Sequence, residues 1–267
     1  MRNLGKNRVL WIITSGLAFV ASCAGVAKPA IYDSLVSSEI LPATISQDLV
    51  AMVLSAAVLL LSIRVKEGEF RKQVAILGVH GFYFYAYGIY VIEQIYTVLY
   101  LVYMAVLGLS FYTVVYGLVN LEADLVQSIR LPGKYRRLSL GLLALTPLVF
   151  YPLWVSQIIP LLGAGRKLEF LFSIYILDIC FIMPLFIIEA YLTARNMGLG
   201  LLTSPALFIT GFGVLAPLSL GEAMKPCIYD MPMDVAGMTM FLVLSVSYLA
   251  MAVLDLRSLS TYNRDDG

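Results

Sequence analysis

The chain has 267 residues, of which 60% are hydrophobic and only 13% are charged, and its formal net charge is +1. Soluble domains carry about 25% charged residues, so this composition excludes an ordinary soluble enzyme and a basic nucleic-acid-binding module. A membrane-spanning helix needs about 20 predominantly apolar residues. Eight apolar stretches of comparable length fill this sequence.

In chain order, the predicted spans run approximately over residues 10–27, 49–63, 74–92, 98–119, 138–156, 170–193, 202–221 and 235–254. Backbone polar groups in lipid must be satisfied within the spanning segment, which favours helices, and the alternation typical of a β-barrel is absent. The connections between the spans are too short to fold alone. We therefore predict an all-α, polytopic membrane protein with a single integral membrane domain over residues 1–267.

Lysine and arginine are distributed unevenly between alternate connections. Fourteen lie in the two termini and the connections on the same side, and the four on the opposite side are Lys28, Arg166, Lys167 and Lys225. The positive-inside rule then places both termini in the cytoplasm, which fits an even number of spans. The outer side is acidic and is expected to attract cations weakly; its acidic residues are Asp33, Glu39, Asp48, Glu93, Glu169, Glu222, Asp230 and Asp234.

The first span also resembles a secretory signal, because basic residues precede an apolar run. The segment Val20-Ala21-Ser22-Cys23 is similar to a bacterial lipoprotein cleavage box. The apolar character continues to Val26, however, and we expect an uncleaved first span.

Tyrosine and phenylalanine concentrate in the third and fourth spans, which are joined so closely that they predict an antiparallel hairpin. Tyr85 and Tyr103 lie too deep to be interfacial anchors only, and buried hydroxyls need partners. Two interpretations follow, namely hydrogen bonding between helices or a pocket wall for a flat or amphipathic ligand. His80, between Gly78 and Gly81, is interpreted as a hydrogen-bonded packing residue at a close helix approach, with a proton-relay role as the alternative.

Asp178 is the acidic residue that lies deepest in a predicted span, and such a residue is costly in lipid. Glu189 follows eleven residues later, which predicts that the two carboxyls share one face of the helix, about 16 Å apart along its axis. Pro184 cannot donate to the carbonyl of Cys180, so the helix is predicted to kink or open between the two carboxyls. Asp178 is either a gated proton or cation site or a protonated acid bonded to a tyrosine such as Tyr175.

A short sequence occurs twice, as Lys28-Pro29-Ala30-Ile31-Tyr32-Asp33 and as Lys225-Pro226-Cys227-Ile228-Tyr229-Asp230. Lysine can extend to the membrane–water interface and proline ends a helix. Both copies are therefore interpreted as segments where a helix ends on the outer side. The alternative is that Lys28 and Lys225 frame an outer ligand site.

Several segments resemble a large family of bacterial multispanning membrane proteins that has no assigned activity. The likeness lies in Gln47-Asp48-Leu49-Val50, the basic turn from Arg64 to Lys72, Gly81-Phe82-Tyr83-Phe84-Tyr85-Ala86-Tyr87, Leu99-Tyr100-Leu101-Val102-Tyr103, Leu109-Ser110-Phe111-Tyr112, Leu177-Asp178 with Pro184, and Gly200-Leu201-Leu202-Thr203-Ser204-Pro205-Ala206. The chain departs from the family at Thr97, where asparagine is frequent. The resemblance implies a multi-pass protein of a prokaryotic cytoplasmic (inner) membrane.

The sequence contains no phosphate loop, zinc-protease motif or lysine within a span, and we expect no cofactor, no metal site, no catalytic residue and no nucleic acid. The favoured function is binding, and possible transport, of a small or amphipathic ligand or a cation among membrane lipids. The expected pocket lies between the aromatic hairpin and the kinked sixth and seventh spans. The candidate residues are Asp178, Glu189, Tyr85, Tyr103, Glu93, Asp48, Lys28 and Lys225. The alternatives are a membrane enzyme that uses Asp178, Glu93 or Asp48 on a lipid, and a sensor or accessory subunit.

Overall fold

The computed structural model describes residues 1–164 and 172–261. It divides the chain into two compact units. The first consists of Met1–Leu121 and Ala206–Ala252, and the second of the described residues of Glu122–Pro205 and Val253–Gly267. The helices α9 and α10 each continue from one unit into the other, since α9 runs over Gly198–Ile228 and α10 over Val235–Ser258.

Eight helices of the described chain are long and apolar enough to cross a membrane. They are α1 (Leu4–Ala27), α2 (Leu41–Arg64), α3 (Phe70–Ile92), α4 (Tyr100–Val119), α6 (Gly133–Ala164), the interrupted helix over 172–194, α9 and α10. The all-α, polytopic architecture with eight spans is therefore confirmed. The predicted start of the sixth span at Phe170 lies outside the described residues, as do Arg166, Lys167, Glu169 and Arg264.

The predicted second span begins too late. Its helix starts at Leu41, with Pro42 in the first turn, where a missing N–H leaves no hydrogen bond unmade. Asp48, which the sequence pattern assigned to the outer acidic side, therefore lies seven residues inside α2, about 10 Å along the axis. The seventh span is also longer than predicted, so that Glu222 and Lys225 belong to α9.

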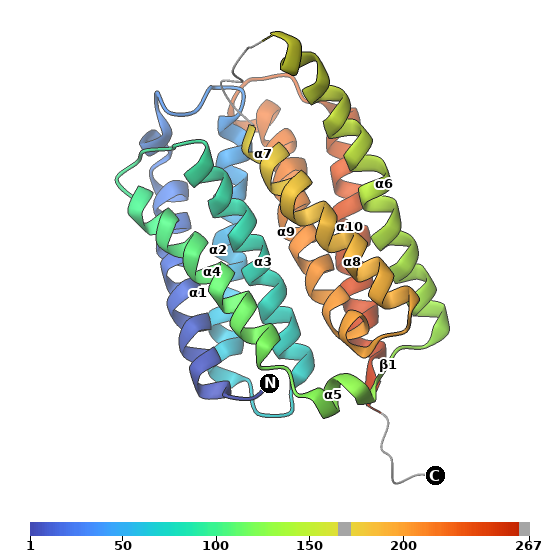
Figure 1. Ribbon diagram of the computed structural model, residues 1–267. Coiled ribbons are helices and arrows are strands. Elements are labelled where there is room, and N and C mark those ends of the chain that lie inside the picture. The colour runs from blue at the N-terminus through green and yellow to red at the C-terminus, as the bar shows by residue number, and fades with distance from the viewer. Residues whose placement is uncertain (165–171, 262–267) are drawn as a thin grey trace, which may run out of the picture. The chain divides into compact units, whose positions relative to one another are not determined.

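In the first unit, α1 to α4 form an antiparallel bundle. Here α1 packs against α2 and α4, and α3 packs against the same two helices. The four helices lie side by side in Figure 1. A seven-residue connection between Ile92 and Tyr100 joins α3 to α4, which confirms the predicted hairpin. A short 3₁₀ turn, η1 (Pro29–Tyr32), follows α1.

The part of α9 that belongs to the first unit approaches α3 at three glycines. A Cβ atom on Gly78 would lie 2.6 Å from the carbonyl oxygen of Ala206, and a Cβ on Gly213 would lie 2.7 Å from the ring of Phe82. The Thr210 hydroxyl bridges the helices by donating to the Gly78 carbonyl at 2.9 Å, beside the tight contact at Gly81. The close helix approach predicted from Gly78 and Gly81 is thus present, as small residues in membrane helix interfaces allow.

The second unit contains α5 (Ala123–Ser128), α6, α7 (Phe172–Leu177), a π-helical segment (Asp178–Ile182) and α8 (Met183–Ala194). The helices α6 and α8 pack against each other and run side by side in Figure 1. A short antiparallel pair, β1 (Ile129–Arg130) with β2 (Ser260–Thr261), ties the end of the described chain to the segment before α6.

Candidate functional site: buried carboxyls and their donors

Asp48 lies at the centre of a cluster of tyrosines in the first unit. Its side chain is only 1% exposed. The tyrosines come from three different elements, with Tyr32 in η1, Tyr87 and Tyr90 on α3, and Tyr103 on α4. Tyr83, Tyr87 and Tyr90 are spaced by four and three residues, which places them on one face of α3. We call Asp48, Tyr32, Tyr90 and Tyr103 the carboxyl cluster.

Hydroxyl groups bind both oxygens of the Asp48 carboxyl. Tyr32 donates to Oδ2 at 2.5 Å, and Tyr90 lies 3.0 Å from Oδ1 and 3.2 Å from the carbonyl oxygen of Thr44. The hydroxyl of Tyr103 lies 3.3 Å from that of Tyr32. Burial, with a further contribution from Tyr90 and Asp48, raises the pKa of the Tyr32 hydroxyl, so Tyr32 remains a donor.

Gly25 closes the cluster on the α1 side. A Cβ atom at this position would overlap Oδ2 of Asp48 and would lie 2.7 Å from the Tyr32 hydroxyl. The rings of Tyr90 and Tyr103 have centroids 5.0 Å apart, and those of Tyr32 and Tyr90 are 6.1 Å apart. The carboxyl is therefore enclosed by aromatic rings and by helix backbone.

Further along α3, the polar groups bond across the bundle. Tyr87 donates to the Ala18 carbonyl at 2.8 Å, and Tyr83 donates to the Ser55 hydroxyl at 2.9 Å. His80 is fully buried, and its Nδ1 donates to the Ile76 carbonyl at 2.8 Å. These contacts agree with hydrogen bonding between helices for the tyrosines and with a packing role for His80. Tyr112 on α4, by contrast, is 66% exposed and takes no part in these contacts.

In the second unit, Asp178 is the first residue of the π-helical segment. The backbone N–H of Met183 donates to the Asp178 carbonyl, five residues back, as in a π turn. Pro184 follows directly and has no N–H to donate. The opening predicted between the two carboxyls is thus confirmed as a π turn. Asp178 itself is 6% exposed.

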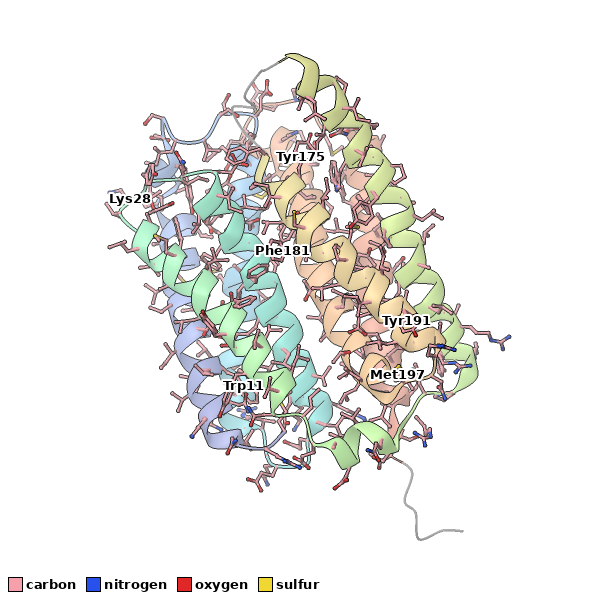
Figure 2. All side chains as sticks on the ribbon, viewed as in Figure 1. Trp11, Lys28, Tyr175, Phe181, Tyr191 and Met197 are labelled. Carbon is pink, nitrogen blue, oxygen red and sulfur yellow. The ribbon has the colours of Figure 1, made fainter. Side chains whose placement is uncertain are left out.

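Two side chains of α6 hold the opened turn. The indole Nε1 of Trp154 donates to Oδ2 of Asp178 at 2.8 Å, and the Tyr151 hydroxyl donates to the Ile179 carbonyl at 3.1 Å. Tyr175, the partner suggested from the sequence, instead donates to Oε1 of Gln157. The suggestion was wrong because Tyr175 lies one turn before Asp178, and its ring meets Trp154 edge-on at 5.5 Å; Figure 2 labels Tyr175 on this helix.

Glu189 contacts a different helix from Asp178. The Thr203 hydroxyl, at the start of α9, lies 2.8 Å from Oε1 of Glu189. A π turn adds one residue to the helix, which rotates later positions by about 100°. The shared face required an uninterrupted α-helix, and it is lost for that reason. Oε2 of Glu189 is buried without a hydrogen-bond partner among the described residues.

The four remaining candidates lie outside the carboxyl cluster. Tyr85 is buried on α3 but lies on a different face from Tyr83 and Tyr87. Glu93 is the residue that ends α3. Lys28 is exposed at the end of α1 away from Trp11 (Figure 2). Lys225 forms an ion pair with Glu222, one turn earlier in α9. Within the described residues, Lys28 and Lys225 therefore have different surroundings and do not form a matched pair.

Three side chains that bond in or to buried carboxyls were not predicted from the sequence. Tyr32 was treated only as part of a helix exit, although a tyrosine beside a short outer connection can fold back onto the bundle. Trp154, a donor within a predicted span, was a usable signal for a partner of an intramembrane acid. Asp255 was placed beyond the eighth span, but α10 extends to Ser258, and Asp255 is buried and accepts from Ser139 at 2.6 Å.

Comparison with known proteins gave no match to a protein-family model, to a curated protein or to a solved structure. The buried carboxyls and their donors are therefore the basis on which function is inferred.

Proposed function

We propose that this integral membrane protein binds a small ligand or cation within the membrane and moves it, with Asp178 as the ionisable group. The observation that carries the proposal is the position of Asp178 at a helix opening. Intramembrane carboxyls mark ion pathways and proton relays, and transporters place such groups where helices are interrupted. The resemblance noted above supports a prokaryotic inner membrane, and the basic residues support cytoplasmic termini.

The π turn that begins at Asp178 is the part of the helix that moves in this proposal. Its Oδ2 accepts from Trp154, while the neighbouring Ile179 carbonyl accepts from Tyr151. Both donors belong to α6, which contains Pro147, Pro152 and Pro160. A π turn can return to α-helical bonding by shifting one residue, so a change of charge on Asp178 can be linked to a change in the bonding of this turn.

Burial favours ion binding over lipid chemistry. An acid or base that acts on a lipid must reach the lipid, whereas Asp48 and Asp178 are both buried and hydrogen-bonded to neutral donors. We therefore favour ligand and cation binding over the lipid-enzyme alternative.

Proteoliposomes that contain the full chain and an internal pH-sensitive dye test the proposal. The probes are an imposed pH gradient and, separately, an imposed Na⁺ gradient. The wild type is expected to move protons in at least one condition, and Asp178→Asn, which keeps a polar side chain of the same shape, is expected to stop this movement. Tyr175→Phe is the matched control, because it removes only the hydrogen bond to Gln157 and leaves the carboxyl and the two donors of the opened turn in place. Equal flux in wild type, Asp178→Asn and empty vesicles would overturn the proposal.

A further inference from the structure

The carboxyl cluster of the first unit contains a second buried acid, Asp48, which takes no part in the function proposed for Asp178. We propose that Asp48 is a proton-binding site and that the connection over residues 28–40 is the wall that opens when the proton leaves. The inference concerns a different unit from the function proposed for Asp178 and does not depend on it.

Hydrogen bonding in the cluster is complete when Asp48 carries a proton on Oδ1. The acid can then donate to the Tyr90 oxygen at 3.0 Å, and Tyr90 can donate its own hydrogen to the Thr44 carbonyl at 3.2 Å. Tyr32 donates to Oδ2, and Tyr103 can donate to Tyr32. All four contacts are used. Without the proton, Tyr90 can donate its single hydrogen either to Oδ1 of Asp48 or to the Thr44 carbonyl, but not to both. One of the four hydrogen bonds is then lost.

The charges around the cluster also favour a bound proton. The groups that interact with Asp48 are Tyr32 of η1, Tyr87 and Tyr90 of α3, and Tyr103 of α4, all of them neutral. From α1, Gly25 faces the carboxyl, and it carries no side chain. The helix α9 meets α2 at Ala43 and Ser46, where its nearby charges, Glu222 and Lys225, pair with each other. A buried carboxylate with no cation must be hydrated or neutralised.

The wall most easily opened is the connection over residues 28–40. The other walls belong to helices of 20 to 24 residues that pack against one another. The connection contains only the four-residue turn η1, and its other residues include the exposed Lys28, Asp33 and Ser34. Tyr32 is its fully buried anchor, and Ile31, Leu35 and Val36 pack partly against the core. Water that hydrates an ionised Asp48 can therefore enter by displacing Tyr32.

Two readouts on the full-length protein in detergent test the two halves of the proposal. Infrared spectroscopy measures the C=O stretch of a protonated carboxylic acid, and we expect Asp48→Asn to remove one such band. Maleimide labelling measures the opening. In a background with Cys23, Cys180 and Cys227 replaced by serine, Leu35→Cys reports the packed side of the connection. Ser34→Cys, which is exposed already, is the matched control and corrects for the effect of pH on thiol reactivity.

We expect the ratio of labelling rates, Leu35→Cys over Ser34→Cys, to rise about tenfold from mildly acidic to mildly alkaline pH, which corresponds to about 1.4 kcal/mol. Asp48→Asn should hold the ratio at its low value throughout. Tyr32→Phe keeps the ring but loses the hydroxyl, and it should raise the ratio at every pH. The proton site is overturned if Asp48→Asn leaves the infrared bands unchanged. The opening is overturned if the ratio in the wild type does not depend on pH, or if it depends on pH equally in Asp48→Asn.

Discussion

Gly25 and Asp48 are in such close contact that one methyl group on Gly25 would overlap Oδ2 of the carboxyl. The glycine belongs to α1 and the carboxyl to α2, and Tyr32 of η1 donates to the same oxygen. A change at Gly25 therefore acts on the carboxyl cluster without removing any of its polar groups.

Gly25→Ala is expected to destabilise the protein by about 1–3 kcal/mol, as overpacking of a tight core does. Thermal unfolding in detergent measures the effect. Gly16→Ala on the same helix is the matched control, because a Cβ there meets nothing within 4 Å, and it should be neutral or slightly stabilising. Equal melting temperatures for the two variants would contradict the close contact at Asp48.

The contact between α3 and α9 gives a second expectation. Gly78→Ala would place a Cβ 2.6 Å from the Ala206 carbonyl oxygen and 2.7 Å from the Cβ of Ile209, at a cost of about 1–3 kcal/mol. Gly108→Ala on α4 has open space around it and serves as the control. If both substitutions lower the melting temperature to the same extent, the close approach at Gly78 is not present.

Trp154→Phe removes the indole donor from Asp178 but keeps an aromatic ring. We expect a loss of about 1–3 kcal/mol, because a buried acceptor loses a hydrogen bond. Tyr175→Phe, which removes only the hydrogen bond to Gln157, should change stability by less than about 0.5 kcal/mol, as peripheral substitutions do. Thermal unfolding again measures the difference, and the reverse order of the two effects would restore Tyr175 as the partner of the carboxyl.

Topology can be tested with reporter fusions after Arg64, Arg137 and Gly267. The excess of basic residues on one side predicts that all three report the cytoplasm. A periplasmic signal at Gly267 would contradict the even parity of the eight spans. Intact mass also tests the first span, since loss of the first 22 residues with a lipid on Cys23 would show cleavage.

The spans were predictable because long apolar runs need no tertiary information. The start of α2 was not predictable, because Thr44, Ser46, Gln47 and Asp48 make the segment polar. A polar segment near a membrane edge is typical of a connection between spans. The structure buries these residues against other protein elements instead. Thr44 and Asp48 meet Tyr90, Ser46 donates to the Pro217 carbonyl, and Gln47 donates to the Ala86 carbonyl.

The type of group that would bond to each carboxyl was predictable from the sequence, but the particular residue was not. An acid in a span requires a donor, and the sequence offered several tyrosines, but which of them reaches Asp48 depends on the fold of η1. For Asp178, proline indicated where the helix opens, whereas the choice of Trp154 over Tyr175 depends on how α6 packs against the opened turn.

The pH dependence of melting in Asp178→Asn tests the central claim, that Asp178 is a functional ionisable group, most directly. Asparagine can replace the hydrogen bonds of a protonated acid but cannot change its charge, so the variant should fold. The account predicts that the wild type changes its melting temperature between mildly acidic and mildly alkaline pH and that Asp178→Asn makes this change smaller, while the part that belongs to Asp48 remains. The companion Asp178→Leu should lower the melting temperature at every pH, because it strands the indole N–H of Trp154. A pH profile of Asp178→Asn identical to that of the wild type would contradict the claim.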